Sequence, residues 1–322
     1  MIYLATAALA LVLLAVPGAG QAQPSRKVPR VGWLTSSVIH EPNLNAFRGG
    51  MAALGYGEIA IEFRAAAGHT DRLPALAAEL TRLKPDVIVV DGSPAAIAAR
   101  HGILDIPIVV GAMADPVSAG IVTSLARPGG NITGFSITTG PELVGKRLDL
   151  LRQTVARLTR IGVVWNESNP TSRSGLEDAT AAAKSLGIAV VPLGVRDANE
   201  IGRTFADLAR SRVGAVLTIS DAFLWSQRDQ IVAFAARNRL PAIYSEPEFA
   251  TAGGLLAYGP NIPDNFRRAA GYVDRILKGA RPGDLPFEQP SKFDLLVNLK
   301  TARTLGLTIP PSVLLQATQV IE

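Results

Sequence analysis

Hydroxyl, amide and carboxylate side chains follow several apolar segments of this chain, at the points where strands would end. In an open parallel sheet, ligands bind beyond the carboxyl ends of the strands. Side chains of these types make directional hydrogen bonds to a small polar ligand. The candidate binding residues that this rule selects are Thr35, Ser36, Ser37, Asp91, Gly92, Ser93, Ala112, Met113, Asp115, Asn166, Asp221, Tyr244 and Glu246.

The acids among these candidates have two alternative roles. Asp115-Pro116 and Glu246-Pro247 each follow an expected strand and precede an expected helix. Each acid could cap its helix and favour the helix dipole, or it could also face the cleft and pair with a ligand amine. Asp91 and Asp221 carry the same two alternatives. Ser93, at the start of a helix, could bind an anionic oxygen through free backbone N–H groups or act as a plain cap.

Two ring side chains lie near expected strand ends. Trp165 aligns with Thr35 and could stack on a flat ligand or belong to the core of its sheet. His40 could reach the cleft or lie solvated in its loop. No pair of histidines stands at the spacing of metal ligands, so no metal and no cofactor is expected.

Sequence signatures of enzymes are missing. The chain has no P-loop, no dinucleotide fingerprint after a strand and no nucleophile elbow. Cofactor-independent amino-acid racemases use a doubled α/β chain, but they need a cysteine from each half, and this chain contains none. We therefore expect a binding protein, with an enzyme on a doubled α/β scaffold as the least favoured alternative.

The elements that must position these residues occur twice along the chain. Residues 30–35 open one copy and residues 160–165 open the other, and both segments read as apolar strands after an arginine. Strands are expected to begin near residues 31, 59, 87 and 106, and again near 161, 189, 215 and 241. Alternating strands and helices with short connections predict parallel sheets joined by right-handed crossovers.

Further segments connect the two copies. Strands are expected at 131–136 and 255–258, each followed by a helix, and one long helix is expected over 223–238. Residues 282–290 are rich in proline and are expected to cross between the lobes, before a strand at 293–298. The predicted fold is α/β, with two doubly wound parallel-sheet lobes joined by a multi-strand hinge. Lobe 1 comprises residues 28–136 plus about 262–284, and lobe 2 comprises residues 137–259 plus about 288–322.

The composition is that of a globular protein, with 48% hydrophobic and 18% charged residues among 322. The formal charge of +5 is spread thinly along the chain. A nucleic-acid-binding protein usually carries a dense basic stripe, so no nucleic-acid partner is expected. The absence of cysteine also removes disulfides and a lipid-modified N-terminal cysteine.

The first residues form an apolar leader. Residues 2–16 are almost wholly apolar and are followed by Pro17, Gly18 and small residues, which is typical of a secretory signal cleaved near Ala22. About 15 apolar residues are too few to span a bilayer, which needs about 20. A positive n-region is expected of such a signal, but no Lys or Arg stands near Met1. An N-terminal membrane anchor is the alternative. The sequence predicts a signal peptide at 1–22.

Several motifs are specific enough to indicate a family. They are Asp115-Pro116-Val117, residues 124–134, residues 142–148, Gly253-Gly254-Leu255, residues 258–261, residues 299–302 and Leu305-Gly306-Leu307. On these motifs the chain resembles the ABC-transporter substrate-binding proteins of the tryptophan/tyrosine-type uptake group. The resemblance runs from about Val28 to the C-terminus.

The resemblance implies a type I periplasmic-binding fold, with three hinge crossings and a solute enclosed when the lobes close. It implies a periplasmic location, docking to an ABC permease with its ATPase subunit, and a small-molecule ligand, an amino acid or aromatic carboxylate being favoured. The positions that match the binding loops of relatives are Thr35 to Ser37, Asp91 to Ser93, Ala112 to Asp115, Asn166, Asp221 and Glu246. A monomer is expected. A periplasmic sensory binding module with the same lobes is the alternative function.

Overall fold

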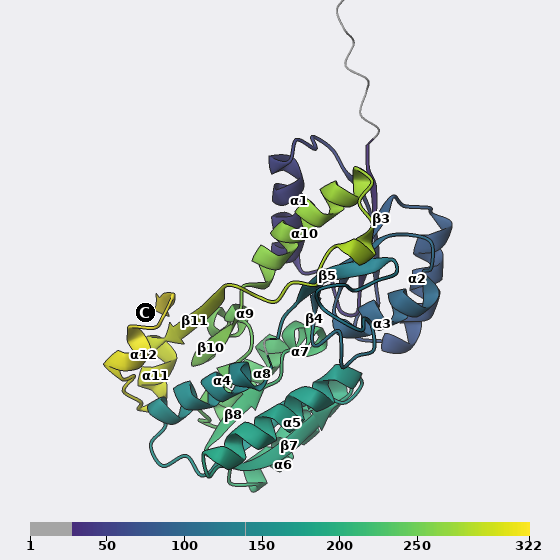
Figure 1. The fold of residues 1–322 in the computed structure, drawn as a ribbon. Coiled ribbons are helices and arrows are strands. Elements are labelled where there is room, and N and C mark those ends of the chain that lie inside the picture. The colour runs from purple at the N-terminus through teal and green to yellow at the C-terminus, as the bar shows by residue number, and fades with distance from the viewer. Residues whose placement is uncertain (1–27, 139) are drawn as a thin grey trace, which may run out of the picture.

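Two α/β lobes lie one above the other and form the molecule (Figure 1). The computed structural model describes residues 28–138 and 140–322, so the expected leader at 1–22 lies outside the described part. Each lobe is built on one sheet, which confirms the predicted fold class. No helix within these described ranges is both long and apolar enough to cross a membrane.

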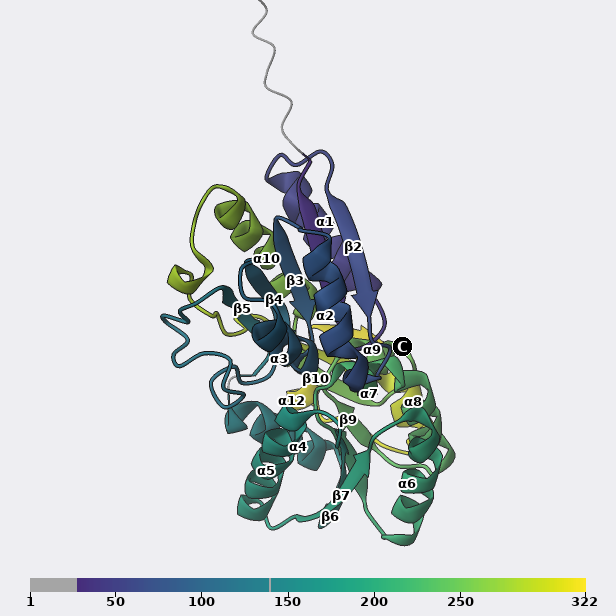
Figure 2. The ribbon, with the colours of Figure 1, turned by 90° about the vertical axis from the view of Figure 1, so that its right-hand side faces the viewer.

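The sheet of lobe 1 has five parallel strands in the order β2-β1-β3-β4-β5. They are β1 (Arg30–Thr35), β2 (Ala60–Ala65), β3 (Val87–Asp91), β4 (Ile108–Met113) and β5 (Ile132–Ser136). Helices α1 (Glu41–Ala53) and α10 (Ile262–Leu277) cover one face. The short helix η1 (Thr70–Arg72), α2 (Leu73–Arg82) and α3 (Ser93–Gly102) lie on the other side (Figure 2). Because both faces are covered, β3 is buried along its whole length and reads as a continuous apolar run up to Asp91.

The sheet of lobe 2 has seven strands in the order β12-β11-β10-β9-β8-β6-β7. They are β6 (Arg160–Asn166), β7 (Ala189–Val195), β8 (Ala215–Thr218), β9 (Ala242–Tyr244), β10 (Leu256–Pro260), β11 (Phe293–Asn298) and β12 (Gln319–Ile321). One face packs against α4 (Pro141–Thr154), α5 (Pro170–Ser185), α11 (Leu299–Leu305) and α12 (Pro311–Leu314). The other packs against α6 (Ala198–Arg210), α7 (Ala222–Ser226), α8 (Arg228–Arg237) and α9 (Pro247–Thr251).

Two sequence expectations need correction in lobe 2. The pair β10 and β11 is antiparallel, because the chain leaves lobe 2 at the cleft end of β10 and re-enters at the same end to form β11. The long helix expected over 223–238 is divided into α7 and α8 at Gln227. Neither glycine nor proline marks that break, and the apolar periodicity runs on across it, so the sequence pattern predicted one continuous helix.

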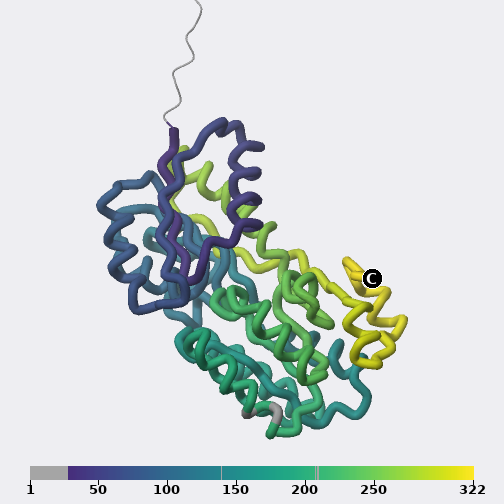
Figure 3. Tube along the Cα trace, turned by 180° about the vertical axis from the view of Figure 1, so that it is seen from behind, coloured from purple at the N-terminus to yellow at the C-terminus, as the bar shows by residue number. Residues whose placement is uncertain are grey.

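The chain passes between the lobes three times (Figure 3). These passages follow β5, follow β10, and join η2 (Pro282–Asp284) to β11. The second passage delivers α10 back to lobe 1, where Phe266 stacks on Trp33 with ring centroids 5.2 Å apart. Lobe 1 is therefore completed by residues that follow most of lobe 2 in the sequence.

Helix α10 packs closely on α1 at Gly50, and this contact leads to a stability prediction. A Cβ atom at residue 50 would lie 2.6 Å from the backbone oxygen of Arg267 and 2.7 Å from the Cβ of Ala270. Gly50→Ala is expected to lower the free energy of unfolding by about 1–2 kcal/mol, because overpacking outweighs the gain in helix propensity.

Gly49 is the matched control, since a Cβ there meets no atom within 4 Å. Gly49→Ala should raise stability by up to about 1 kcal/mol. Urea unfolding followed by circular dichroism measures both, and equal stability of the two variants would contradict the packing argument.

Candidate functional site

Two neighbouring cavities lie between the lobes, and Ser220 lines both of them. We call the smaller one, of about 60 Å³, chamber A, and the larger one, of about 570 Å³, chamber B. Chamber A is lined by nine of the predicted residues, namely Thr35, Ser37, Asp91, Gly92, Ser93, Ala112, Met113, Asp221 and Glu246. Asp115 lines chamber B instead. The carboxyl ends of strands from both sheets therefore meet at one cleft.

Three predicted residues line neither chamber. The hydroxyl of Ser36 packs against Gly92, whose φ of +96° and lack of a side chain allow this approach. Asn166 lies behind the wall and donates from Nδ2 to the carboxylate of Asp221 at 3.1 Å. Tyr244 lies in the core of lobe 2, stacked on Phe249 with ring centroids 4.8 Å apart.

Several lining residues were absent from the sequence prediction because they come from the first turns of helices. Asn43 stands on α1, Trp225 on α7 and Glu248 on α9. His40, for which a cleft position was one alternative, also lines chamber A. Trp165 instead belongs to the core of lobe 2. The available signal was proximity, since His40, Asn43, Trp225 and Glu248 follow the ends of β1, β8 and β9 within about two helical turns of sequence.

Asp221 and Asp91 differ in how fully their carboxylates are used. Asp221 caps α7 by accepting from the backbone N–H groups of Phe223 and Leu224 at 2.9 and 3.0 Å. It also accepts from Asn169 Nδ2 at 2.8 Å. Within the described part of the chain, the Asp91 carboxylate accepts one hydrogen bond, from Asn43 Nδ2 at 3.4 Å. Burial raises the pKa of both carboxyl groups. Asp91 therefore has the more available carboxylate in chamber A.

Glu246 and Asp115 also differ from each other. Glu246 makes no side-chain cap to α9 and instead accepts from the hydroxyls of Ser220 and Ser245. Burial raises the pKa of Glu246 to about 7. Asp115 accepts from the N–H and the hydroxyl of Ser118, at 3.1 and 2.6 Å. Burial acts to raise the pKa of Asp115, but these bonds outweigh it and hold the pKa below its usual value.

The start of α3 corrects the expected role of Ser93. The N-cap of α3 is Gly92, and Ser93 is the first helical residue. The φ of +96° at Gly92 suits glycine, so the helix begins one residue earlier than it would with Ser93 as its cap. The Ser93 hydroxyl accepts from the N–H of Ala114 at 2.9 Å and ties the ends of β3 and β4 together.

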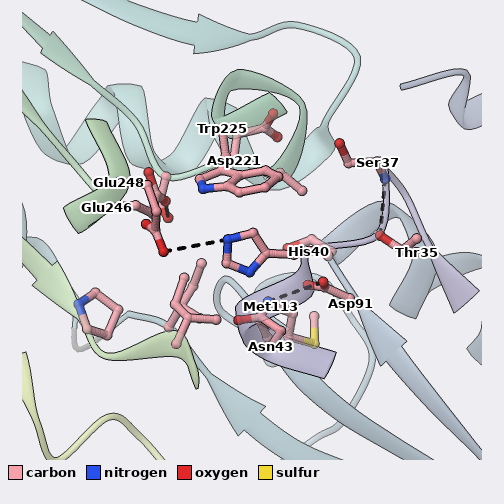
Figure 4. Close-up of a pocket in the computed structure, with 18 of the residues that line it drawn as sticks. Thr35, Ser37, His40, Asn43, Asp91, Met113, Asp221, Trp225, Glu246 and Glu248 are labelled. Atoms are coloured by element: carbon pink, nitrogen blue, oxygen red, sulfur yellow. Dashed lines mark hydrogen bonds and ion pairs between the residues drawn. The ribbon is translucent and has the colours of Figure 1, made fainter. Parts of the chain in front are cut away.

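His40 crosses the cleft from lobe 1 to lobe 2 (Figure 4). Its ring meets the edge of Trp225 with centroids 3.8 Å apart at an interplanar angle of 85°. Its Nε2 lies 3.6 Å from Oε1 of Glu248. Burial acts to lower the pKa of His40, but the nearby carboxylate of Glu248, the charge of Asp91 and the Asn43 side chain together raise it. The pKa of Glu248 is lowered by His40 despite burial.

The contact of His40 with Glu248 predicts a pH-dependent preference for the closed arrangement. Because the pKa of His40 is raised above 6.5 when the lobes meet, its stabilisation is full below pH 6.5 and is lost as pH rises through the raised value. An ion pair worth roughly 1 kcal/mol would change the ratio of closed to open protein about fivefold. Small-angle scattering of the ligand-free protein between pH 6 and 9 should show expansion. His40→Gln should show less expansion over the same range. An identical response of this variant would contradict the role of His40 and would point instead to Glu246, which also titrates in chamber A.

Chamber A contains buried polar atoms that have no hydrogen-bond partner among the described residues. They are Ser37 Oγ, His40 Nδ1, Asn43 Oδ1 and Trp225 Nε1. Buried polar groups are normally hydrogen-bonded, so such a cluster in one cavity is typical of a site that binds a polar ligand. No group of three or more His, Asp or Glu within 28–138 and 140–322 could hold a metal ion.

Known proteins share this sequence pattern and this fold. The family model described as ABC transporter substrate binding protein matches residues 36–321. A tyrosine-binding protein of Clostridioides difficile (strain R20291) is 27% identical over 290 residues, covering 88% of this chain and 82% of that protein. The ABC domain from Streptococcus pneumoniae in complex with L-Trp superposes with a TM-score of 0.85 at 27% identity, covering 91% of this chain and 100% of that one.

A ligand-free, open structure gives a useful contrast. This substrate-binding protein with adhesive properties, from Clostridium difficile, superposes with a TM-score of 0.64 at 26% identity, covering 91% of this chain and 99% of that one. Identity and coverage nearly equal those of the L-Trp complex. The lobes of this chain are therefore arranged more like those of the complex than those of the open structure.

Proposed function

The chain belongs to the ABC transporter substrate-binding protein family, and we propose that its cleft binds an amino acid, one with an aromatic or apolar side chain being favoured. Members of this family are solute-binding components of ABC transporters. The proposal concerns the ligand, the residues that hold it and the place where the protein acts. The observation that carries it is the set of buried, unpartnered polar atoms beside an available carboxylate in chamber A.

The charge of chamber A favours a ligand with a protonated amine. Four acidic side chains line it, those of Asp91, Asp221, Glu246 and Glu248, against one histidine, His40, which pairs with Glu248, and no Lys or Arg stands among the described residues of its wall. A buried carboxylate is favoured in its ionised form when a cation lies beside it. Asp91 is the best acceptor for an ammonium group, because the carboxylate of Asp221 is engaged by the cap and by amide donors.

The remaining wall suits an apolar or aromatic side chain. Trp225 supplies an aromatic surface, and Val38, Met113, Ile137 and Ile262 supply aliphatic contacts. Aromatic rings pair well with one another in offset or edge-to-face arrangements. The related proteins named for tyrosine and L-Trp agree with this choice.

Hinge closure is the proposed mechanism. A ligand that contacts both lobes at once does so only in the closed arrangement, so it shifts the population toward that arrangement. Substrate-binding proteins of ABC importers act outside the cytoplasm. We propose that this one acts in the periplasm after removal of residues 1–22, and that its closed form docks to an ABC permease and its ATPase subunit.

Thermal-shift screening followed by isothermal titration calorimetry tests the ligand class. The purified protein is screened against the twenty common amino acids, their decarboxylated amines and aromatic carboxylic acids. We expect at least one amino acid to raise the melting temperature and to bind with a dissociation constant below about 0.1 mM. Binding of acids that lack an amine, with no binding of any amino acid, would overturn the proposal.

A further inference from the structure

Chamber B contains a buried arginine whose guanidinium group is only partly used. Arg147, on α4, is 2% exposed and lines this chamber. Its Nε donates to the backbone oxygen of Tyr258 at 2.7 Å, but its Nη2 has no partner among the described residues. A buried charged donor left unpaired is costly, so a missing acceptor is the natural explanation.

Arg147 remains a cation in this position. Burial lowers its pKa to about 10, while the charges of Glu246 and Tyr258 act in the opposite direction. The carboxylate of Glu246 is bound by two serine hydroxyls, and no ion pair joins it to Arg147 within the described part of the chain. With Nε donated to Tyr258, Nη2 is the donor that remains available to an anion such as a carboxylate.

The helices around chamber B add to this positive character. The first turns of α4 and α5, each helix at least 14 residues long, line the chamber at Pro141, Pro170 and Thr171. The helix dipole favours negative charge at such positions, although Pro141 and Pro170 have no N–H group and the N–H of Thr171 is already donated to Asn169 Oδ1 at 3.1 Å. With about 570 Å³, the chamber has room for more than a carboxylate alone.

Two acids oppose the entry of a simple anion. Asp115 and Asp178, one from each lobe, also line chamber B, and Asp115 is exposed. Burial and the charges of Glu142, Glu177 and Asp115 raise the pKa of Asp178. A free dianion is therefore disfavoured. A molecule that carries an ammonium group as well as a carboxylate is compatible with both the positive charge of Arg147 and the negative charges of the two acids.

We propose that Arg147 binds a carboxylate group of the solute whose ammonium group is held in chamber A. This inference rests on the proposed function and adds a carboxylate subsite to it. Ser220, which lines both chambers and hydrogen-bonds Glu246, marks their junction. The carboxylate belongs either to the amino acid itself or to a residue joined to it, as in a dipeptide.

Calorimetry with L-tryptophan and tryptamine on the wild-type protein and on Arg147→Gln tests the subsite, because tryptamine keeps the indole and the amine but lacks the carboxylate. We expect the wild-type protein to bind L-tryptophan at least tenfold more tightly than tryptamine. Arg147→Gln should lose at least tenfold for L-tryptophan and less than twofold for tryptamine. L-Tyrosine and tyramine serve as a second pair. The dipeptide Trp-Gly distinguishes the two sources of carboxylate, because it should bind more tightly than L-tryptophan if Arg147 binds the carboxylate of a joined residue.

Arg152→Gln is the matched control, because Arg152 lies on the same helix with an exposed side chain that pairs with Asp149. It should leave all affinities unchanged. Equal losses for the acid and the amine in Arg147→Gln would overturn the subsite while leaving the proposed function intact. If Arg147→Gln does not fold, L-tryptophan and L-tryptophanamide are compared on the wild-type protein, where equal affinities would overturn it. Failure of the wild-type protein to bind any amine-bearing compound would overturn both proposals.

Discussion

Replacing Asp91 by asparagine is expected to weaken binding of an amino acid ligand by about 100-fold. The carboxylate is buried in chamber A, and Asn43 alone hydrogen-bonds it among the residues that the structure describes. Truncating one partner of a buried, hydrogen-bonded charge pair costs about 2–5 kcal/mol, mainly through faster dissociation. Calorimetry at pH 7.5 with the best amino acid from the screen measures the loss.

The same substitution should make the ligand-free protein more stable. Burial raises the pKa of Asp91, while His40 and Asn43 oppose that change. Because the folded pKa lies above that of the unfolded chain, the carboxyl group contributes most stability at low pH and loses it as pH rises through the folded value. Asparagine removes this cost at neutral pH, so the melting temperature should rise while the affinity falls.

Opposite changes in affinity and stability distinguish a binding role from a structural one. Asp105→Asn is the control, since Asp105 is exposed and precedes β4, at the edge of the sheet away from the cleft. It should change neither quantity. An affinity of Asp91→Asn within threefold of wild type would show that another acid holds the amine, and Glu246 would then be the next to test.

Trp225→Ala is expected to weaken ligand binding by roughly 30-fold or more, the loss typical of an aromatic hot spot. Trp225 lines chamber A from lobe 2 and meets His40 of lobe 1. Its removal takes away both an aromatic wall and a contact between the lobes. Trp225→Phe should recover most of the affinity, because an aromatic ring remains.

Tryptophan fluorescence gives an independent measurement for the same residue. The chain has three tryptophans, and the other two, Trp33 and Trp165, lie in the cores of the lobes. With L-tyrosine as ligand, Trp225→Phe should abolish most of the emission change on binding, and Trp165→Phe should keep it. The reverse result would mean that Trp165 reports the ligand and that Trp225 does not contact it.

The repeated strand pattern was sufficient to predict both sheets because buried parallel strands are apolar along their length and alternate with helices of regular spacing. Segments such as β3 and β8 are wholly buried, so their sequences leave little choice of structure. The direction of β11 was not predictable from such local patterns. It depends on where the chain re-enters lobe 2 after α10.

The site was predicted as far as strand ends could indicate it. Asp91 ends β3 and Glu246 closely follows β9, and both line chamber A. His40, Trp225 and Glu248 come together only because the two lobes face each other, and no local periodicity encodes the angle between lobes. Asp115 illustrates a further limit. Its position after a strand predicted a carboxylate free to bind a ligand, but the N–H of Val117 and the hydroxyl of Ser118 donate to that carboxylate within its own turn.

The return of α10 to lobe 1 has a consequence for the order in which the protein can form. Phe266 completes the apolar core around Trp33. The core of lobe 1 therefore cannot be completed until about 270 residues have left the ribosome. Domains usually fold as units from the N-terminus during synthesis. Here the lobe begun first is completed only after most of the other lobe has been made, and a nascent chain truncated before Ile262 should expose the Trp33 face to chaperones.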